Sequence, residues 1–288
     1  YYASRGLGDV YKRQDKKMMK KLFCLCLCLV SFLCVLSSCK KDENIIIVGT
    51  MYQPGEPILN FVKDKFEEKG YQLKIQLFNN FSLPNDALAE KSIDANLFQH
   101  KPFLDNYNEA QHQDLKSVLA YYDCVYGGYT KKQITSVEDI PNGSKITIAS
   151  DASNLSRCLY ILQATGLITL EENIETAMIE NIVSNPKNLQ IVPVSAELIA
   201  QTLDDEDTYL GIVNATYAIA AGLTDKQLIC QEADPQHKNA NILAVRSEDV
   251  HKQWVKDLIE VLTDEETIQF IQDTFKGTIV PYCQRVDN

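Results

Sequence analysis

Residues 45–78 read IIIVGTMYQPGEPILNFVKDKFEEKGYQLKIQLF, and this stretch decides the fold. The opening β-branched run is typical of a buried strand. Pro57 then begins a helical pattern, with apolar residues three and four apart, which ends at Gly70. Residues 72–78 alternate polar and apolar, as a half-exposed strand does. A strand, a helix and a strand in this order predict an α/β sheet with helices packed on its faces.

The same alternation continues along the chain. Further strands are expected at 93–98, 115–122, 125–129, 145–149, 189–194, 209–213 and 242–245, and further helices at 84–91, after 154, at 196–203 and, in two parts, within 251–276. A single sheet rarely contains so many short strands, so we expect two lobes with a cleft between them. Extended stretches near 122–128 and 233–240 give a first lobe of residues 44–124 plus 238–288 and a second lobe of residues 125–237.

An uncharged segment, Leu22–Leu36, precedes this region. At ~1.5 Å per residue it covers roughly 22 Å, less than the ~30 Å that a membrane-spanning helix must cross. Four lysines come before it and two serines follow it, so residues 18–38 are expected to be a secretory signal peptide. The stretch 1–17 has mixed charge and fits neither a signal peptide nor a fold. We therefore expect it to be a non-native leader.

Cys39 closes the sequence Leu-Ser-Ser-Cys, which resembles the bacterial lipobox. This resemblance implies that acyl chains are attached to Cys39 and that residues 39–43 form a tether between the lipid and the fold. The alternative is a plain signal peptide whose cleavage site contains a cysteine. The lipobox reading predicts a membrane-anchored lipoprotein of the cell envelope, facing the periplasm or the cell exterior.

The net charge disfavours one class of partner, and the cysteine count leaves the disulfide state open. Without residues 1–38 the chain has 21 basic and 37 acidic residues, a net charge of −16, which disfavours nucleic acid as a partner. Four cysteines lie beyond the tether, and they could pair in three ways or stay free: Cys124, Cys158, Cys230 and Cys283.

Motifs that would indicate an enzyme or a metal site are missing from the sequence. The four histidines have no metal-binding spacing, and the GxSxG, Walker and GxGxxG patterns do not occur. We therefore expect a binding protein without a cofactor, a metal or catalytic residues. A cysteine–histidine nucleophile assembled only in space stays open as an alternative.

Several polar segments at strand ends resemble the NlpA/MetQ family of lipoproteins, the methionine-binding components of an ABC importer. The matching motifs are Asp94–His100 (DANLFQH), Pro84–Leu88 (PNDAL), Asn154–Arg157 (NLSR), Asn185–Leu189 (NPKNL), Asn214–Leu223 (NATYAIAAGL) and Asn241–Arg246 (NILAVR). They occur in the family's order over most of the mature chain. The resemblance implies a two-lobed, periplasmic-binding-protein-like fold (type 2) with the ligand between the lobes. It also implies a permease partner, and we expect a monomer.

The resemblance also implies a ligand-binding site. The candidate residues are Phe81, Phe98, His100, Phe103, Arg157, Asn214 and Asn241. A guanidinium such as that of Arg157 suits a bidentate contact with an amino-acid carboxylate, and amides both donate to carboxylates and accept from ammonium groups. The phenylalanines would hold a thioether, since sulfur–aromatic contacts contribute about 0.3–1.5 kcal/mol each. Each residue also has a simpler interpretation: a surface ion pair, core packing, a helix cap or a turn.

Three features depart from the family pattern. Thr216 replaces the usual second Asn of N-x-N-Y, Phe81 and Phe103 occupy positions that are often Tyr, and the loop 49–56 lacks the usual G-P-H ending. Without these tyrosine hydroxyls the pocket would be drier. The leading hypothesis is a lipid-anchored protein that binds L-methionine and delivers it to a permease. The alternatives are a binder of a methionine dipeptide or another apolar amino acid, a lipid-anchored hydrolase, and an adhesin or scaffold.

Overall fold

The opening segment folds as its pattern predicts, in a computed structural model that describes residues 44–286. β1 (Ile45–Met51) and β2 (Gln72–Phe78) are parallel neighbours joined by α2 (Gly55–Glu68). The apolar residues of α2 are buried, and each contributes about 1.5–3 kcal/mol by leaving water: Ile58, Leu59, Val62 and Phe66. Only glycine fits at position 55, because a Cβ there would lie 1.7 Å from the Thr50 hydroxyl oxygen.

The first of two large sheets has six strands in the order β13-β4-β12-β3-β1-β2. Its other strands are β3 (Ala95–His100), β4 (Leu115–Cys124), β12 (Asn241–Arg246) and β13 (Ile279–Arg285). β1 is parallel to β2 and β3, whereas the pairs formed by β12 and β13 are antiparallel. The accompanying helices are α3 (Pro84–Ala89), α4 (Lys101–Gln111), α8 (Gln253–Leu262) and α9 (Glu265–Phe275), with a 3₁₀ turn at Ser247–Asp249.

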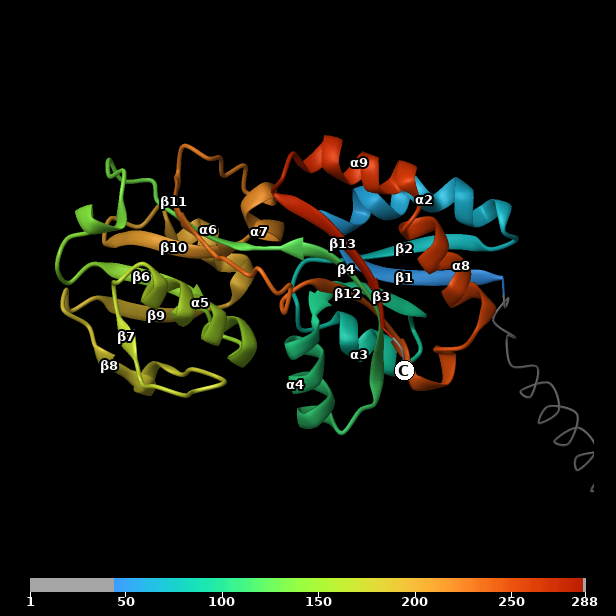
Figure 1. Ribbon diagram of the computed structural model, residues 1–288, viewed down its shortest axis with the longest axis horizontal. Coiled ribbons are helices and arrows are strands. Elements are labelled where there is room, and N and C mark those ends of the chain that lie inside the picture. Colours follow the sequence, from blue (N-terminus) through green and yellow to red (C-terminus); the bar gives the residue numbers. More distant parts are fainter. Residues whose placement is uncertain (1–43, 287–288) are drawn as a thin grey trace, which may run out of the picture. The chain divides into compact units, whose positions relative to one another are not determined.

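The C-terminal helix is divided in two, as predicted, by a helix cap. Asp264 precedes α9, and its Oδ1 accepts a hydrogen bond of 2.7 Å from the backbone N–H of Thr267. Both helices pack on α2 (Figure 1). Phe61 of α2 and Phe270 of α9 stack there, with ring centroids 4.2 Å apart. The two ends of the chain therefore meet in one helical layer beside the six-stranded sheet.

The second sheet has five strands in the order β11-β5-β10-β6-β9. These are β5 (Tyr126–Tyr129), β6 (Lys145–Ala149), β9 (Gln190–Val194), β10 (Thr208–Asn214) and β11 (Leu228–Gln231). Its helices are α5 (Ala152–Ala164), α6 (Ile199–Thr202) and α7 (Ala215–Ala220), with 3₁₀ turns at Val137–Asp139, Ile179–Asn181 and Ala196–Leu198. A small ladder of β7 (Thr169–Leu170) and β8 (Ile182–Ser184) lies outside this sheet.

The chain passes between the two sheets twice. It leaves the six-stranded sheet after Cys124, at the end of β4, and enters the other sheet at Tyr126. It returns through residues 232–240, between β11 and β12. These two crossings join the halves of the molecule, and the site described below lies beside them.

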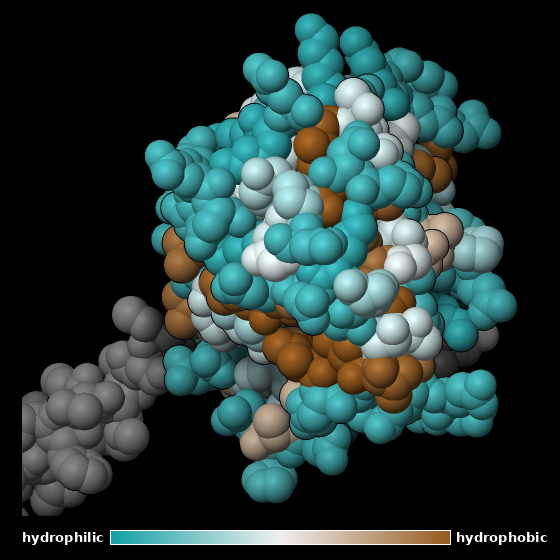
Figure 2. Space-filling model, turned by 90° about the vertical axis from the view of Figure 1, so that its left-hand side faces the viewer, coloured by the Kyte–Doolittle hydropathy of each residue, from teal (hydrophilic) through white to brown (hydrophobic). Residues whose placement is uncertain are grey.

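The predicted leader, signal peptide and Cys39 lie outside the described residues. Within residues 44–286, no helix combines the length and apolar character needed to span a bilayer. The face at the end that carries the five-stranded sheet is largely hydrophilic, with an apolar band across its lower half (Figure 2). Of the exposed large apolar residues, Met178 and Val183 belong to the region around β8.

Candidate functional site

His100 joins the two halves of the molecule. Its Nδ1 accepts a hydrogen bond of 3.2 Å from the backbone N–H of Phe103, which caps α4. Its Nε2 lies 2.9 Å from Oδ1 of Asn154, on the first turn of α5. Because Nδ1 accepts, Nε2 carries the proton and donates it to Asn154. The end of β3 is thus bonded to the start of a helix that packs on the other sheet.

The His100 ring is neutral. Burial, followed by the nearby Arg157 charge, lowers the pKa of His100 to about 3. At neutral pH this side chain therefore offers one donor and one acceptor, and both are used. The helix cap that the sequence left open as the simpler role of His100 is present, together with a bond across the two halves.

A narrow cavity with about 230 Å³ of empty space lies at this junction. It is lined by Phe81, Phe98, Gln99, His100, Phe103, Asn154, Asn214 and Asn241. Six of the seven predicted site residues therefore meet around one space, although they come from positions 81 to 241. Gln99 and Asn154 belong to the quoted motifs but were not among the predicted site residues.

Aromatic rings form one wall of the cavity. Phe98 and Phe103 meet edge to face with ring centroids 5.9 Å apart, and Phe81 lies 6.0 Å from Phe98. Phe81 also packs on Tyr217 of α7 at 4.9 Å. Aromatic pairs of this kind contribute about 0.5–1.5 kcal/mol beyond the area that they bury. Tyr217 was not predicted as a site residue, although the NATYAIAAGL motif contains it.

Two amides present complementary groups on the polar side. The Oδ1 of Asn214 accepts from the backbone N–H of Thr216 at 2.9 Å, which caps α7. Its Nδ2 has no hydrogen-bond partner within residues 44–286. The Nδ2 of Asn241 donates to the Phe98 carbonyl at 3.0 Å, and its Oδ1 has no partner among the described residues. The cavity therefore has one open amide donor and one open amide acceptor.

Arg157 is buried beside this site but does not line the cavity. Its Nε and Nη2 donate to the two carboxylate oxygens of Glu232, at 2.9 and 2.6 Å. Its Nη1 lies 3.4 Å from Oδ1 of Asn154, and its guanidinium lies over the Tyr126 ring at 4.8 Å. The bidentate edge predicted for a ligand is thus occupied by Glu232. The Nη1 edge is directed at a residue of the cavity wall.

Glu232 was not predicted from the sequence. It lies on the return crossing, 75 residues after Arg157, and its Oε2 also accepts from the backbone N–H of Tyr126 at 3.2 Å. No local pattern marks such a residue, because its partners are brought together only by the two crossings.

Three buried amides form a hydrogen-bonded network, and one of them, Gln99, lines the cavity. Asn85 and Gln99 form a reciprocal pair, with bonds of 2.7 and 2.6 Å between their amide groups. Asn96 donates to Asn85 at 2.9 Å and accepts from Gln99 at 2.9 Å. A network whose members satisfy one another makes the backbone of β3 rigid. This gives a structural reason for the PNDAL and DANLFQH motifs.

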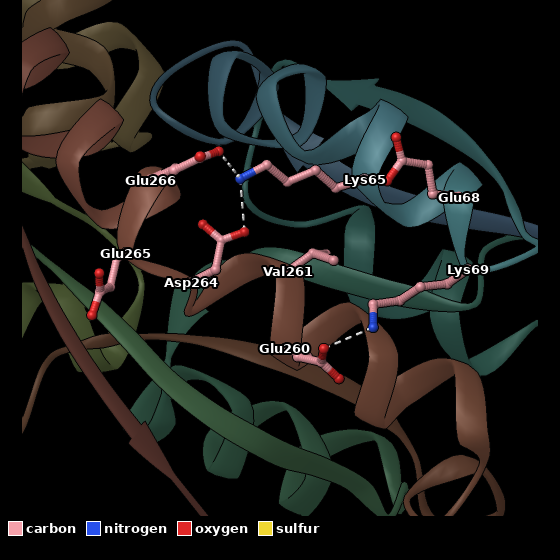
Figure 3. A pocket seen from close by; sticks show the side chains of 8 residues that line it. All are labelled: Lys65, Glu68, Lys69, Glu260, Val261, Asp264, Glu265 and Glu266. Carbon is pink, nitrogen blue, oxygen red and sulfur yellow. Dashed lines mark hydrogen bonds and ion pairs between the residues drawn. The ribbon is translucent and has the colours of Figure 1, made fainter.

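A larger open groove, with about 1130 Å³ of empty space, lies between α2, α8 and α9. Figure 3 shows Lys65 reaching between Asp264 and Glu266, and Lys69 directed at Glu260. These ion pairs are near the surface, where each contributes about 0–1 kcal/mol. The lysines of this groove already have acidic partners. The smaller cavity is therefore the candidate ligand-binding site, although the groove is larger. Within residues 44–286, no cluster of His, Cys, Asp or Glu could hold a metal ion.

A two-lobed α/β fold with a cavity at the junction of its sheets defines a substrate-binding protein, and solved structures agree. A nutrient binding protein from Burkholderia cenocepacia bound to methionine has a TM-score of 0.78 at 33% identity, covering 82% of this chain and 99% of that one. An ABC transporter periplasmic substrate-binding protein from Coxiella burnetii has a TM-score of 0.77 at 32% identity, covering 82% of this chain and 100% of that one.

The sequence comparison identifies the family. Residues 46–283 match the model of the NlpA lipoprotein family. The D-methionine-binding lipoprotein MetQ of Escherichia coli (strain K12) is 33% identical over 246 residues, which cover 84% of this chain and 89% of the relative. The chain belongs to the NlpA lipoprotein family. This confirms the resemblance found in the motifs, and with it the expectation of a substrate-binding protein rather than an enzyme.

Proposed function

We propose that this protein binds methionine in the cavity between its lobes and delivers it to the permease of an ABC importer. The observation that carries the proposal is the cavity wall, which combines three phenylalanine rings with one open amide donor and one open amide acceptor. A free amino acid with an apolar side chain presents the matching set: a carboxylate, an ammonium group and a chain that prefers apolar surroundings.

The unpaired groups suggest an orientation for the ligand. The carboxylate would accept from Nδ2 of Asn214, and the ammonium group would donate to Oδ1 of Asn241. The thioether would lie against the rings of Phe81, Phe98 and Phe103. Arg157 would act through its charge and its Nη1 edge, because Glu232 occupies the bidentate edge.

The closed cavity is smaller than its proposed ligand. About 10 Å³ is open to the centre of a water-sized sphere, which is room for about one water molecule, whereas pockets for drug-sized ligands have ~300–1,000 Å³. Entry therefore requires that the lobes separate, and we place the hinges at the crossings after Cys124 and within 232–240. The lobes in this proposal are residues 44–124 plus 238–288 and residues 125–237. A ligand that touches both lobes stabilises the closed form, because its contacts are complete only there.

The anchor and the location belong to the same proposal. Lipid attached to Cys39 would hold the monomeric protein at the membrane of the cell envelope, with the lobes facing the periplasm or the cell exterior. Membership of a lipoprotein family and the Leu-Ser-Ser-Cys sequence support this arrangement.

The described cysteines argue against the hydrolase alternative. Within residues 44–286 the four cysteines are unpaired. Burial raises the pKa of Cys158 to about 12 and those of Cys230 and Cys283 to about 11. A nucleophilic cysteine requires the opposite shift, toward the thiolate.

Calorimetry and thermal unfolding of the mature protein test the proposal. L-methionine, D-methionine, a methionine dipeptide and leucine are titrated separately. We expect a methionine enantiomer to bind most tightly and to stabilise the fold by about 4 kcal/mol at 1,000 times its dissociation constant. Tighter binding of the dipeptide or of leucine would assign another ligand, and no binding of any of the four would reject the proposal. Native mass spectrometry of the purified protein would reveal a retained ligand.

A further inference from the structure

Cys124 lies against the polar side of the cavity without lining it. It is the last residue of β4, at the first crossing, and only 1% of its surface is exposed. Its Sγ lies 3.3 Å from Oδ1 of Asn214 and 3.5 Å from Oγ1 of Thr216. Its carbonyl oxygen accepts from Nη2 of Arg157 at 3.4 Å. One buried side chain thus touches the amide that faces the cavity and the residue that departs from the family pattern.

The thiol acts as a hydrogen-bond donor here. Burial raises the pKa of Cys124, although hydrogen bonds from Thr216 and the Arg157 charge oppose the shift, so the sulfur keeps its proton at neutral pH. An S–H group is a weak donor, and Oδ1 of Asn214 is an acceptor that cannot donate in return. Thr216 can donate its hydroxyl hydrogen to the sulfur, which gives a short chain from Thr216 through Cys124 to Asn214.

The two bonds to Oδ1 determine what the amide presents to the cavity. A carbonyl oxygen has two lone pairs, and those of Asn214 face the Thr216 N–H and the Cys124 S–H. Rotating the amide by half a turn would place an NH₂ group against these two donors, which is unfavourable. Nδ2 is therefore the group left for the cavity.

We infer that Cys124 is a positioning residue: its S–H group, together with the Thr216 N–H, holds the Asn214 amide so that a donor, and not an acceptor, faces the ligand. This inference rests on the proposed function, in which that donor binds the carboxylate of methionine. It makes the crossing after β4 part of the specificity of the site as well as a connection between the lobes.

A double-mutant cycle tests the inference. The dissociation constant for methionine is measured by calorimetry in the wild type, Cys124→Ala, Asn214→Ala and the double variant. We expect Cys124→Ala to weaken binding by about 3-fold, near the lower end of the effect of one hydrogen bond, because an S–H group is a weak donor. In the Asn214→Ala background the same change should alter binding less than about 2-fold, because the residue that it positions is gone.

Two further variants separate positioning from packing. Cys124→Ser keeps a donor and should bind methionine within about 1.5-fold of the wild type, so it also tests the inference if the alanine variant unfolds. Cys283→Ser is the matched control. Its sulfur contacts the Tyr121 carbonyl at 3.7 Å, away from the cavity, and its binding should equal that of the wild type.

Each result has one meaning. Equal losses from Cys124→Ala with and without Asn214 would show that the cysteine acts through packing, which overturns the inference. Unchanged binding in Cys124→Ala, or a loss in Cys124→Ser as large as that in Cys124→Ala, would overturn it as well. If the wild type itself does not bind methionine, the proposed function is wrong and the inference is rejected with it.

Discussion

Two arginines, the buried Arg157 and the partly buried Arg246, bind carboxylates in different parts of the molecule. Arg246 ends β12, where it pairs with Asp94 at 3.3 Å and Asp249 at 2.7 Å, and it donates to the carbonyls of Leu88 and Ile93. All of these partners lie in the part of the molecule that carries the six-stranded sheet. Arg157 instead contacts both crossings, through the Cys124 carbonyl and Glu232, and it points its remaining edge at the cavity wall.

The two guanidinium groups have the same chemistry, but Arg246 serves stability and Arg157, in the proposed function, serves recognition. Arg246 donates to two backbone carbonyls and balances the charge of Asp94 and Asp249, so its contribution is to the fold. Arg157 has its charge balanced by Glu232, yet it acts on the cavity through Asn154 and lowers the pKa of His100.

Arg157→Ala should have the largest effect. Removing one partner of a buried ion pair costs about 3–5 kcal/mol, because the Glu232 carboxylate is left unpaired. Loss of the positive charge beside the cavity should also weaken methionine binding by about 100-fold, which corresponds to roughly 2.7 kcal/mol. Urea unfolding and calorimetry measure the two losses separately.

A second substitution sharpens this test. In Arg157→Ala combined with Glu232→Gln, the unpaired charge is absent, so part of the stability should return while binding stays weak. If methionine bound as tightly to the double variant as to the wild type, Arg157 would have no part in recognition.

Arg246→Ala should cost a similar 3–5 kcal/mol of unfolding free energy and nothing in affinity. Asp249 is only 1% exposed and would keep only Lys252 as a charged partner. Urea unfolding gives the stability, and calorimetry on the fraction that remains folded gives the dissociation constant. A tenfold change in that constant would contradict the division between the two arginines.

Local sequence patterns predicted most of the fold but not all of the strands at the edges of its sheets. Most of the strands and helices from β1 to β12 could be predicted because they have a clear periodicity and stop signals. β13 was not predicted: its sequence IVPYCQR contains Pro281, and it pairs with β4, more than 150 residues earlier. β11 and the β7–β8 ladder are short and carry weak patterns.

The cavity lining was predictable where motifs contain it. His100, Asn214 and Asn241 end or begin strands, where polar groups collect in α/β sheets, and the structure places all three around the cavity. Glu232 and Cys124 could not be found in this way. Each has a contact that defines its role only after folding joins segments 75 and 90 residues apart.

Acid should destabilise the protein through His100. The pKa of His100 is lowered to about 3 in the fold, against about 6.5 when unfolded, so the unfolded chain binds the extra proton between these values. Stability from the neutral ring is complete above pH 6.5 and falls as pH drops, by up to about 1.4 kcal/mol per pH unit or roughly 2 kcal/mol at pH 5.

His100→Asn is the matched control for this slope, because asparagine also caps helices but does not titrate. Urea unfolding at several pH values should show a smaller loss in this variant than in the wild type. Arg157→Ala should reduce the slope and Arg246→Ala should not, since only the Arg157 charge contributes to lowering the pKa of His100. If the free energy of unfolding changed equally with pH in all four proteins, titration of His100 would not be the cause of the acid sensitivity, and the Arg157 charge would not act on it.

Phe81→Tyr should have the smallest effect and tests how dry the cavity next to Arg157 is. The substitution restores the residue that is common in the family at this position, on a ring that packs 4.9 Å from Tyr217. A hydroxyl without a partner disfavours the closed form, so we expect binding to weaken by less than about 3-fold. Phe61→Tyr, in the stack with Phe270 on α2, is the control and should leave the dissociation constant unchanged. Tenfold tighter binding by Phe81→Tyr would show that the hydroxyl meets the ligand, and that recognition here relies on polar contacts where the present wall offers only rings.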